Sequence, residues 1–257
     1  MSLKILKGIL RENVRKKTKF NLKNNFFIGY DIWNLYELSW LNLKGIPQLA
    51  LGIVEIDAKS INLIESKSLK LYLHELSNKT FFSKKEFKEK IKSDLKKIVK
   101  GKIVVNLFRL NHENFNLIRE PYGVNLDNEK INFFNNLKDK NILCINNKTE
   151  IIKESLYSNL LKSNCPITNQ PDWASIEISY KGFPINRKSL FIYLIKFRNT
   201  NKFHEDCVEK IFSDIIDFCN PIELTVYARY NRRGGIDINP WRSNKAFSPS
   251  YKRFVRQ

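Results

Sequence analysis

The sequence predicts an α+β fold, in which antiparallel sheets are covered on one face by helices. Two observations carry this prediction. Segments typical of strands are followed by segments typical of helices instead of alternating with them. In addition, one unit occurs twice, because Lys67–Leu73 recurs as Lys188–Leu194 and Glu89–Leu95 recurs as Glu209–Ile215, at offsets of 121 and 120 residues. Self-similarity at a nearly constant offset indicates a duplicated structural unit.

The first copy has the order strand, strand, helix, helix, strand. Its expected elements are strands over 33–41 and 48–57 with a turn over 44–47, a helix over 66–76, a helix from 83 that ends at 101, and a strand over 102–110. The second helix has a clear start, because Ser83 followed three residues later by Glu86 fits a capping box. Gly101 then ends this helix.

The second copy repeats this order. Its expected elements are a strand over 174–180, helices over 188–197 and 207–219, and a strand over 223–230. Between the copies, residues 111–140 are polar and weakly periodic, which predicts a long connection with local structure. We therefore divide the chain into a basic N-terminal arm over 1–25, a first unit over 26–150 and a second unit over 151–257.

The composition limits the kinds of partner. The net charge of +19 favours an anionic ligand, but Lys outnumbers Arg 33 to 12. Arg is the residue that bidentate phosphate contacts and base recognition favour, so we expect no direct nucleic-acid partner. No apolar run reaches the roughly 18 residues of a membrane span. The N-terminus lacks the apolar core of a secretory signal, which predicts a cytoplasmic protein with a flexible N-terminal arm.

The cysteines differ in their sequence context. Cys207 and Cys219 fall at helical spacing with apolar residues, which predicts buried thiols, and Cys144 lies in a short apolar run typical of a strand. Cys165 instead lies in Ser163–Trp173, where two prolines and several amides predict an extended loop. We expect no metal site, because closely spaced Cys and His pairs are absent from the sequence.

The loop around Cys165 is the first candidate for chemistry. A cysteine outside any packing stripe is a candidate nucleophile, and Asp172 follows seven residues later, near enough to meet it. The alternative is a loop with a half-buried thiol and an aspartate that only stabilises a turn.

The two copies have also diverged at their helix starts. The first copy has Glu65 and Ser66 where the second has Asn186 and Arg187. Ser66 can cap its helix and leave backbone N–H groups for a phosphate, with Lys67 adding positive charge. The second copy carries His204-Glu205 where the first has two lysines. Each copy keeps polar residues that the other lacks, which suggests one composite site, although ordinary helix capping would explain both places.

A further candidate is the segment over 232–242, which follows the last repeated strand. Gly234 and Gly235 permit tight turns, and the neighbouring Arg233 suits a phosphate group. A β-bulge or a hairpin would explain the glycines equally well. The chain has no G-x-G motif, so the Rossmann mode of dinucleotide binding is excluded.

Taken together, these motifs resemble the NADPH-dependent 7-cyano-7-deazaguanine reductases, the nitrile reductases of queuosine biosynthesis, in the two-copy form of that family. The segments that carry the resemblance are Asp31–Trp33, Tyr36–Trp40, Glu65–Ser68, Ser163–Cys165, Gln170–Trp173, Phe203–Glu205 and 232–244. The resemblance implies two tandem tunnelling-fold units of ββααββ type, a homodimer, NADPH as cofactor and 7-cyano-7-deazaguanine as substrate. The N-terminal 25 residues carry no part of it.

The resemblance also implies a role for each candidate residue. Cys165 would add to the nitrile as a covalent thioimide, Asp172 would donate a proton, and His204 would orient the substrate or assist proton transfer. Substrate binding is implied for Ile64, Glu65, Ser66, His204 and Glu205, and NADPH binding for Ser66, Lys67, Arg233 and Gly234. Two alternatives stay open: a thiol hydrolase or transferase that uses Cys165 with His204, and an RNA-binding module that uses the positive surface.

Overall fold

The fold is built on an eight-stranded sheet in the part of the chain that the computed structural model describes, which is residues 2–18, 26–131 and 143–257. The strand order is β5-β3-β2-β10-β9-β8-β7-β6, with antiparallel neighbours except for the short parallel pair of β6 and β7. These strands are β2 (Ile28–Leu41), β3 (Pro47–Asp57), β5 (Ile103–Phe108), β6 (Val124–Asn125), β7 (Ile152–Asn164), β8 (Pro171–Gly182), β9 (Glu223–Tyr230) and β10 (Ile236–Ser243). The α+β class with antiparallel pairing is confirmed.

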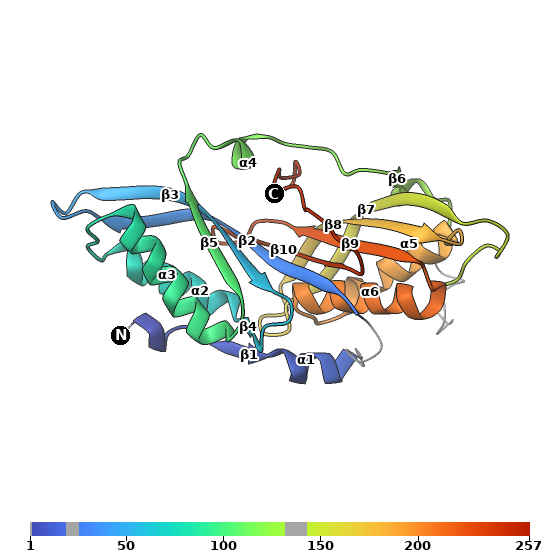
Figure 1. The fold of residues 1–257 in the computed structure, drawn as a ribbon, viewed down its shortest axis with the longest axis horizontal. Helices are drawn as coiled ribbons and strands as arrows, with labels where there is room; N and C mark the ends of the chain where they lie inside the picture. Colours follow the sequence, from blue (N-terminus) through green and yellow to red (C-terminus); the bar gives the residue numbers. More distant parts are fainter. Residues whose placement is uncertain (1, 19–25, 132–142) are drawn as a thin grey trace.

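The longer helices cover one face of the sheet (Figure 1). They are α2 (Ser66–Ser77) and α3 (Lys84–Val99) in the first half, and α5 (Arg187–Ile195) and α6 (His204–Cys219) in the second. Each pair of helices packs on its own half of the sheet and forms a separate apolar core. A polar connection with α4 (Glu113–Asn116) passes over the opposite face, and part of the predicted 111–140 linker lies outside the described residues.

The duplication is visible in matching side-chain contacts. The Tyr72 hydroxyl donates to Asp94 Oδ2 at 3.0 Å, and the Tyr193 hydroxyl donates to Asp214 Oδ2 at 2.7 Å. These pairs lie at corresponding positions of the two sequence repeats, between the two helices of each half. Each half also carries a register shift at the same place in its first hairpin, between β2 and β3 and between β7 and β8. The sequence repeat is therefore a structural repeat.

Strand β10 joins the two halves. It pairs with β2 from Ile236–Leu35 to Ser243–Ile28, and with β9 from Trp241–Tyr227 to Ser243–Thr225. Of the readings left open for the segment over 232–242, the hairpin is the one observed, because a tight turn at Gly234 and Gly235 leads into β10 and most of the segment is a buried strand. The sequence did not indicate this strand because charged residues are uncommon in buried strands. Here Asp237 and Arg242 are buried because they have polar partners inside the fold.

Two further expectations near the second unit are wrong. Residues 163–173 are not a free loop, because β7 continues to Asn164 and β8 begins at Pro171, leaving a short hairpin turn. The bulge in β7 interrupts the alternation of apolar residues that would have indicated this strand. The predicted strand around Cys144 is also absent from its described part, where Cys144 is exposed and only Ile145 forms a bridge, to Ile185.

The N-terminal arm is ordered over the residues described there, which corrects the expectation of flexibility. A 3₁₀ turn (Ser2–Lys4) leads into β1 (Gly8–Leu10) and α1 (Arg11–Thr18). Strand β1 pairs with β4 (Asn62–Ile64), and the side chains of Arg11 and Arg15 are buried. Residues 19–25 of the predicted arm lie outside the described residues. Buried arginines show that this segment belongs to the folded body.

Candidate active site

A hairpin between β7 and β8 brings Cys165 and Asp172 to the same end of the sheet. Ser163 lies opposite Asp172 in the strand register, and the Cys165 N–H donates to the Gln170 carbonyl at 2.8 Å. The Asn169 N–H closes the turn by donating to the Cys165 carbonyl at 2.9 Å. The chain reversal, rather than the loop expected from the prolines, holds the thiol close to the carboxyl group.

The turn also activates the thiol. Cys165 is half-buried, and burial raises the pKa of its thiol. Hydrogen bonds from the Thr168 hydroxyl and from the N–H groups of Thr168 and Ile167 outweigh burial and the nearby Asp172, so the Cys165 pKa lies below its ordinary value of 9.0. A larger thiolate fraction at neutral pH makes this cysteine a better nucleophile. The contrast is with Cys207, where burial raises the pKa of the thiol to about 12.

The pKa of Asp172 is shifted upward, whereas that of Cys165 is shifted downward. Its side chain is buried, and burial raises the pKa of the carboxyl group above its ordinary value of 3.8. Arg233 and Lys70 oppose this shift, with Arg233 Nη2 at 3.0 Å from Asp172 Oδ1. A thiol with a lowered pKa and a carboxyl group with a raised pKa, on one hairpin and within electrostatic range of each other, are suited to act as nucleophile and acid.

His204 is the first residue of α6 and contacts Asp172. Its Nε2 atom lies 3.7 Å from Asp172 Oδ2, and its ring packs edge-on against Tyr230 at 4.0 Å between centroids. Burial, together with Arg233 and Lys70, lowers the pKa of His204 to about 3. The imidazole is therefore neutral at physiological pH, so it serves as a hydrogen-bonding group and not as a cation paired with Asp172.

A small pocket of about 20 Å³ joins residues of both halves. It is lined by Ser66, Lys70, Asp172, His204, Asn231, Arg233, Ile236 and Ile238. Ser66 and Lys70 come from helix α2 of the first half, and the others come from the second half and β10. The structure thus brings together Ser66, Asp172, His204 and Arg233, as a composite site requires. Ligand pockets commonly measure hundreds of Å³, so a nucleobase-sized ligand needs side chains here to move.

Glu65 caps helix α2, which corrects the assignment of that role to Ser66. Its carboxylate accepts hydrogen bonds from the N–H groups of Lys67 at 2.9 Å and Ser68 at 2.7 Å. These two N–H groups are therefore not free for a phosphate, contrary to the expectation for this helix start. Each carboxylate oxygen keeps a second lone pair, so Glu65 can still accept from a ligand. Ile64, just before it, has its side chain in the apolar core.

Glu205 follows His204 and is buried. Burial and the neighbouring Asp31 raise the pKa of its carboxyl group to about 8, while Arg11 and Arg242 act in the opposite direction. Among the described residues, its carboxyl group accepts a hydrogen bond from its own N–H and from no other residue. A buried carboxyl group without a partner residue is available to a ligand that donates hydrogen bonds.

The turn after β9 places Arg233 and Gly234 against helix α2. Gly234 has a φ of +60°, and a Cβ there would lie 3.0 Å from Lys70 Nζ. Arg233 also donates a hydrogen bond to Gln170 Oε1. The left-handed backbone conformation of this turn therefore favours glycine, and the Lys70 amine lies close beside it. The nearby Lys67 is exposed.

Lys70 is a site residue that the sequence analysis missed. It lines the pocket, and burial together with Arg233 lowers the pKa of its amine. Asp172, Glu65 and Cys165 act on it in the opposite direction, so it lies within electrostatic range of all three. Its helical position one turn after Ser66 was the available signal, because residues four apart share a helix face. In the sequence it appears as one more lysine in a basic helix.

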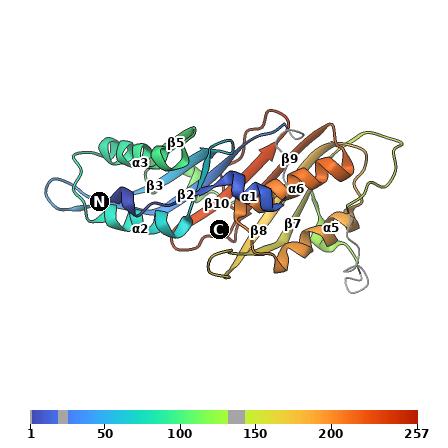
Figure 2. The ribbon, with the colours of Figure 1, turned by 90° about the horizontal axis from the view of Figure 1, so that it is seen from below.

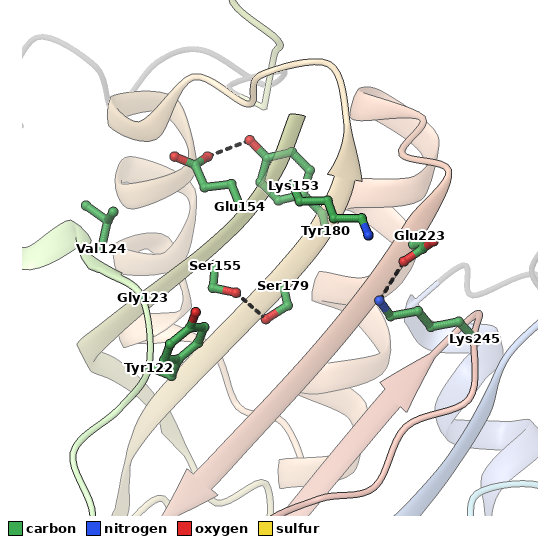
Figure 3. Close-up of a pocket in the computed structure, with 10 residues that line it drawn as sticks. All are labelled: Tyr122, Gly123, Val124, Lys153, Glu154, Ser155, Ser179, Tyr180, Glu223 and Lys245. Carbon is green, nitrogen blue, oxygen red and sulfur yellow. Dashed lines mark hydrogen bonds and ion pairs between the residues drawn. The ribbon is translucent and has the colours of Figure 1, made fainter. Parts of the chain in front are cut away.

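Another, wider hollow lies away from the small pocket. It measures about 440 Å³, contains none of the candidate residues and lies over β7 and β8, on the sheet face away from the helices (Figure 3). No group of His, Cys, Asp and Glu among the described residues is arranged to hold a metal ion. Within the same ranges, no helix is both long and apolar enough to cross a membrane.

Comparison with known proteins bears on the whole chain. Residues 2–107 match the family model described as nitrile reductase, 7-cyano-7-deazaguanine-reductase N-term, and residues 171–248 match a model described as QueF-like protein. The first match begins at residue 2, so the N-terminal segment is part of the family pattern. An apo archaeosine synthase QueF-Like structure covers 40% of this chain and 100% of its own at 12% identity, but its TM-score of 0.34 carries no weight for the fold.

A curated relative gives the clearest comparison. The NADPH-dependent 7-cyano-7-deazaguanine reductase of Buchnera aphidicola subsp. Schizaphis graminum (strain Sg) is 50% identical over 262 residues, which cover 100% of each chain. Identity of this extent over the full length, together with the two family models, shows the family. The chain belongs to the 7-cyano-7-deazaguanine nitrile reductases.

Proposed function

We propose that this protein uses NADPH to reduce the nitrile of 7-cyano-7-deazaguanine to an aminomethyl group, through a covalent thioimide on Cys165. The observation that carries the mechanism is the pairing of a thiol whose pKa is lowered with a carboxyl group whose pKa is raised, on one hairpin. The relative's name supports the substrate and the cofactor. Within the queuosine pathway, the product would be 7-aminomethyl-7-deazaguanine.

The first step forms a bond between sulfur and carbon. The Cys165 thiolate adds to the electrophilic nitrile carbon, and the electron pair of one C–N π bond moves to nitrogen. Asp172 in its acid form gives its proton to that nitrogen and becomes a carboxylate, which completes the thioimide. The raised pKa of Asp172 supports this role, because a fully ionised aspartate has no proton to give.

Substrate recognition falls to the two glutamates from opposite halves. Glu65 and Glu205 would accept hydrogen bonds from the ring N–H and amino group of the deazaguanine, a task that carboxylates fit. Donors on the substrate would stabilise the ionised form of Glu205 and lower its pKa from about 8. Neutral His204, in contact with Asp172, would orient the substrate beside the acid.

The residues around the pocket fit a nicotinamide dinucleotide phosphate. Arg233, Lys70 and exposed Lys67 supply positive charge, and Gly234 leaves room where a Cβ would meet Lys70. We assign Ser66, Lys67, Arg233 and Gly234 to cofactor binding, with Lys70 added by the structure. When bound, NADPH supplies hydride, and about two equivalents are needed per nitrile.

Arg233 would have to leave Asp172 when ligands bind. In the structure it forms an ion pair with Asp172 at 3.0 Å and helps to close the small pocket. Its movement to a cofactor phosphate would remove the positive charge that holds the pKa of Asp172 down. Asp172 would then be protonated to a larger extent, at the stage at which the nitrile nitrogen needs a proton.

The proposal includes the larger assembly that the resemblance implies. We infer two tandem tunnelling-fold units, over 26–150 and 151–257, that work as a homodimer. The matching contacts Tyr72–Asp94 and Tyr193–Asp214 support the tandem units. The dimer rests only on the resemblance of the sequence motifs to the two-copy reductases.

The thiol hydrolase alternative receives little support. It needs a histidine that takes the proton of Cys165, but the pKa of His204 is lowered to about 3 and its close partner is Asp172. A base with so low a pKa removes a thiol proton poorly near neutral pH.

The decisive experiment measures NADPH oxidation with 7-cyano-7-deazaguanine for the unmodified protein, Cys165→Ala and Cys144→Ala. Cys144 is an exposed cysteine beside helix α5, where its N–H donates to the Ser189 hydroxyl, so its replacement is the matched control. We expect about two NADPH per amine in the unmodified protein and the control, with turnover lost in Cys165→Ala. A covalent adduct seen by mass spectrometry on Cys165 without NADPH would support the thioimide. Turnover by Cys165→Ala would refute it.

A further inference from the structure

The N-terminal segment reaches both halves of the proposed substrate site. Residues 2–18, here called the N-terminal brace, run beneath the sheet from helix α2 of the first half to helix α6 of the second (Figures 1 and 2). The brace forms two kinds of contact, a backbone contact beside Glu65 and an ionic contact beside Glu205. These are the two carboxylates to which the proposed function assigns substrate recognition.

Backbone hydrogen bonds fix the start of helix α2 to the brace. Strand β1 pairs with β4, and Gly8 lies opposite Ile64. The Glu65 N–H donates to the Lys7 carbonyl at 2.9 Å, and the Lys7 N–H donates to the Ser68 hydroxyl at 3.0 Å. Glu65 is therefore held by the brace through its backbone, while its carboxylate caps the helix.

Buried ion pairs fix the other end of the brace. Arg11 Nη2 lies 2.5 Å from Asp31 Oδ2 of β2, and Arg15 Nη2 lies 2.7 Å from Glu209 Oε1 of α6. Arg242 of β10 connects these acids, at 2.9 Å from Asp31 Oδ1 and 2.8 Å from Glu209 Oε1. The cluster therefore links α1, β2, β10 and α6, four elements drawn from both halves of the chain.

The charges of this cluster are balanced only if Glu205 is included. Among the described residues, Arg11, Arg15 and Arg242 face Asp31 and Glu209, which leaves one positive charge in excess. Glu205 lies one helical turn before Glu209 on the same face of α6, and its carboxyl group is influenced by Asp31, Arg11 and Arg242. An ionised Glu205 would neutralise the group. Without the brace, one arginine would face three carboxyl groups.

We propose that the N-terminal brace is a positioning element of the substrate site, in which Lys7 holds the backbone of Glu65, Arg11 supplies positive charge beside Glu205, and Arg15 anchors the brace to Glu209 on the same helix as Glu205. The proposal rests on the assignment of Glu65 and Glu205 to substrate recognition. Neither arginine lines the pocket, so both act through the glutamates. The three residues are positioning residues and take no part in the chemistry.

A purely structural role for the brace predicts a different result. Loss of packing would lower stability and turnover together. It would not shift the pKa of Glu205 in opposite directions when a positive or a negative neighbour is removed. The electrostatic role predicts opposite changes for opposite charges. Removing Arg11 should raise the pKa of Glu205 above about 8, and removing the charge of Asp31 should lower it, because the two act on Glu205 in opposite directions.

The test is a titration of the ligand-free protein, labelled with ¹³C at glutamate carboxyl groups and followed by NMR. Glu205→Gln identifies the Glu205 signal. We compare Arg11→Met and Asp31→Asn with Lys16→Met, a control on the same helix whose side chain is 69% exposed and pairs only with exposed Glu12 among the described residues. The Glu205 midpoint should rise by about one pH unit or more in Arg11→Met, fall in Asp31→Asn and stay in place in Lys16→Met.

Substrate binding is the second measurement. We expect the Kd for 7-cyano-7-deazaguanine, measured without NADPH, to rise about tenfold in Arg11→Met. Arg11→Lys should restore most of the affinity, and kcat should change much less than KM. Should Arg11→Met fail to fold, Arg11→Lys and Asp31→Asn still test the sign of the titration shift. An unchanged Glu205 midpoint in Asp31→Asn, or equal shifts in all variants, would refute the proposal that the charges around the brace control the ionisation of Glu205. If the titration shifts are as expected but the unmodified protein does not bind 7-cyano-7-deazaguanine, the assignment of the substrate is wrong and the electrostatic role of the brace still stands.

Discussion

Replacing Glu209 by Gln should destabilise the fold by about 3 kcal/mol, because this carboxylate holds the brace to the second half. It accepts hydrogen bonds from Arg15 at 2.7 and 2.8 Å and from Arg242 at 2.8 and 3.1 Å. Its side chain is 4% exposed, so water cannot replace these bonds. Glutamine keeps the shape but removes the charge, which leaves two buried guanidinium groups without their shared anion.

The magnitude follows from the pKa of Glu209. Burial raises this pKa, but the attraction of Arg242 and the hydrogen bonds and charge of Arg15 outweigh burial and lower it from 4.5 to about 2. That difference corresponds to about 3 kcal/mol of interaction with the ionised form. Removing one partner of a buried pair costs about 3–5 kcal/mol in general, which agrees. For a chain of this length the melting temperature should fall by about 6–12 °C.

The assay is denaturant unfolding of the unmodified protein, Glu209→Gln and Glu12→Gln. Glu12 is the matched control, because its side chain is 68% exposed and its pairing with Lys16 should contribute less than about 1 kcal/mol. A group whose pKa is lowered by folding stabilises fully above its unfolded pKa and loses that effect as the pH falls toward the folded value. The difference between the unmodified protein and Glu209→Gln should therefore fall to less than half at about pH 3.

Two outcomes would refute this reasoning. If Glu209→Gln unfolds within about 0.5 kcal/mol of the unmodified protein at neutral pH, the cluster contributes no net stability. If the destabilisation is the same at about pH 3 as at about pH 7, it comes from altered packing and not from the lost charge.

Two further predictions concern the chemistry. Asp172→Asn should lower kcat/KM by about 10²–10⁴-fold, because the amide has no acidic proton. The loss of rate above the pKa of Asp172 should also disappear from the pH profile of this variant. An unchanged profile would exclude Asp172 as the donor. Thr168→Val should raise the pKa of Cys165, since the hydroxyl hydrogen bond is lost while the N–H groups of Thr168 and Ile167 remain. Alkylation of Cys165 by iodoacetamide should then reach half its maximal rate at a higher pH than in the unmodified protein, and an unchanged midpoint would mean that the N–H groups alone stabilise the thiolate.

The local pattern of this sequence determined much of the fold and part of the site. The repeat offsets predicted the duplicated helices, and the structure places Tyr72 and Tyr193 in matching contacts with Asp94 and Asp214. Helix periodicity and capping signals act over a few residues, so α2, α3 and α6 begin and end close to the predicted positions. The same local signals separated Cys165 from the buried cysteines, because a packing stripe is visible in sequence.

Only the tertiary structure decided how distant charges combine. Arg11 and Arg15 appear in sequence as part of a basic arm, yet they are buried against Asp31 and Glu209, the latter nearly 200 residues away. Strand β10 was hidden for the same reason, because its charged side chains are neutralised by partners far along the chain. Whether a charge lies in water or in a cluster depends on contacts that no local pattern encodes. The ionisation of Glu205 is thus a property of the folded assembly and not of its neighbours in sequence.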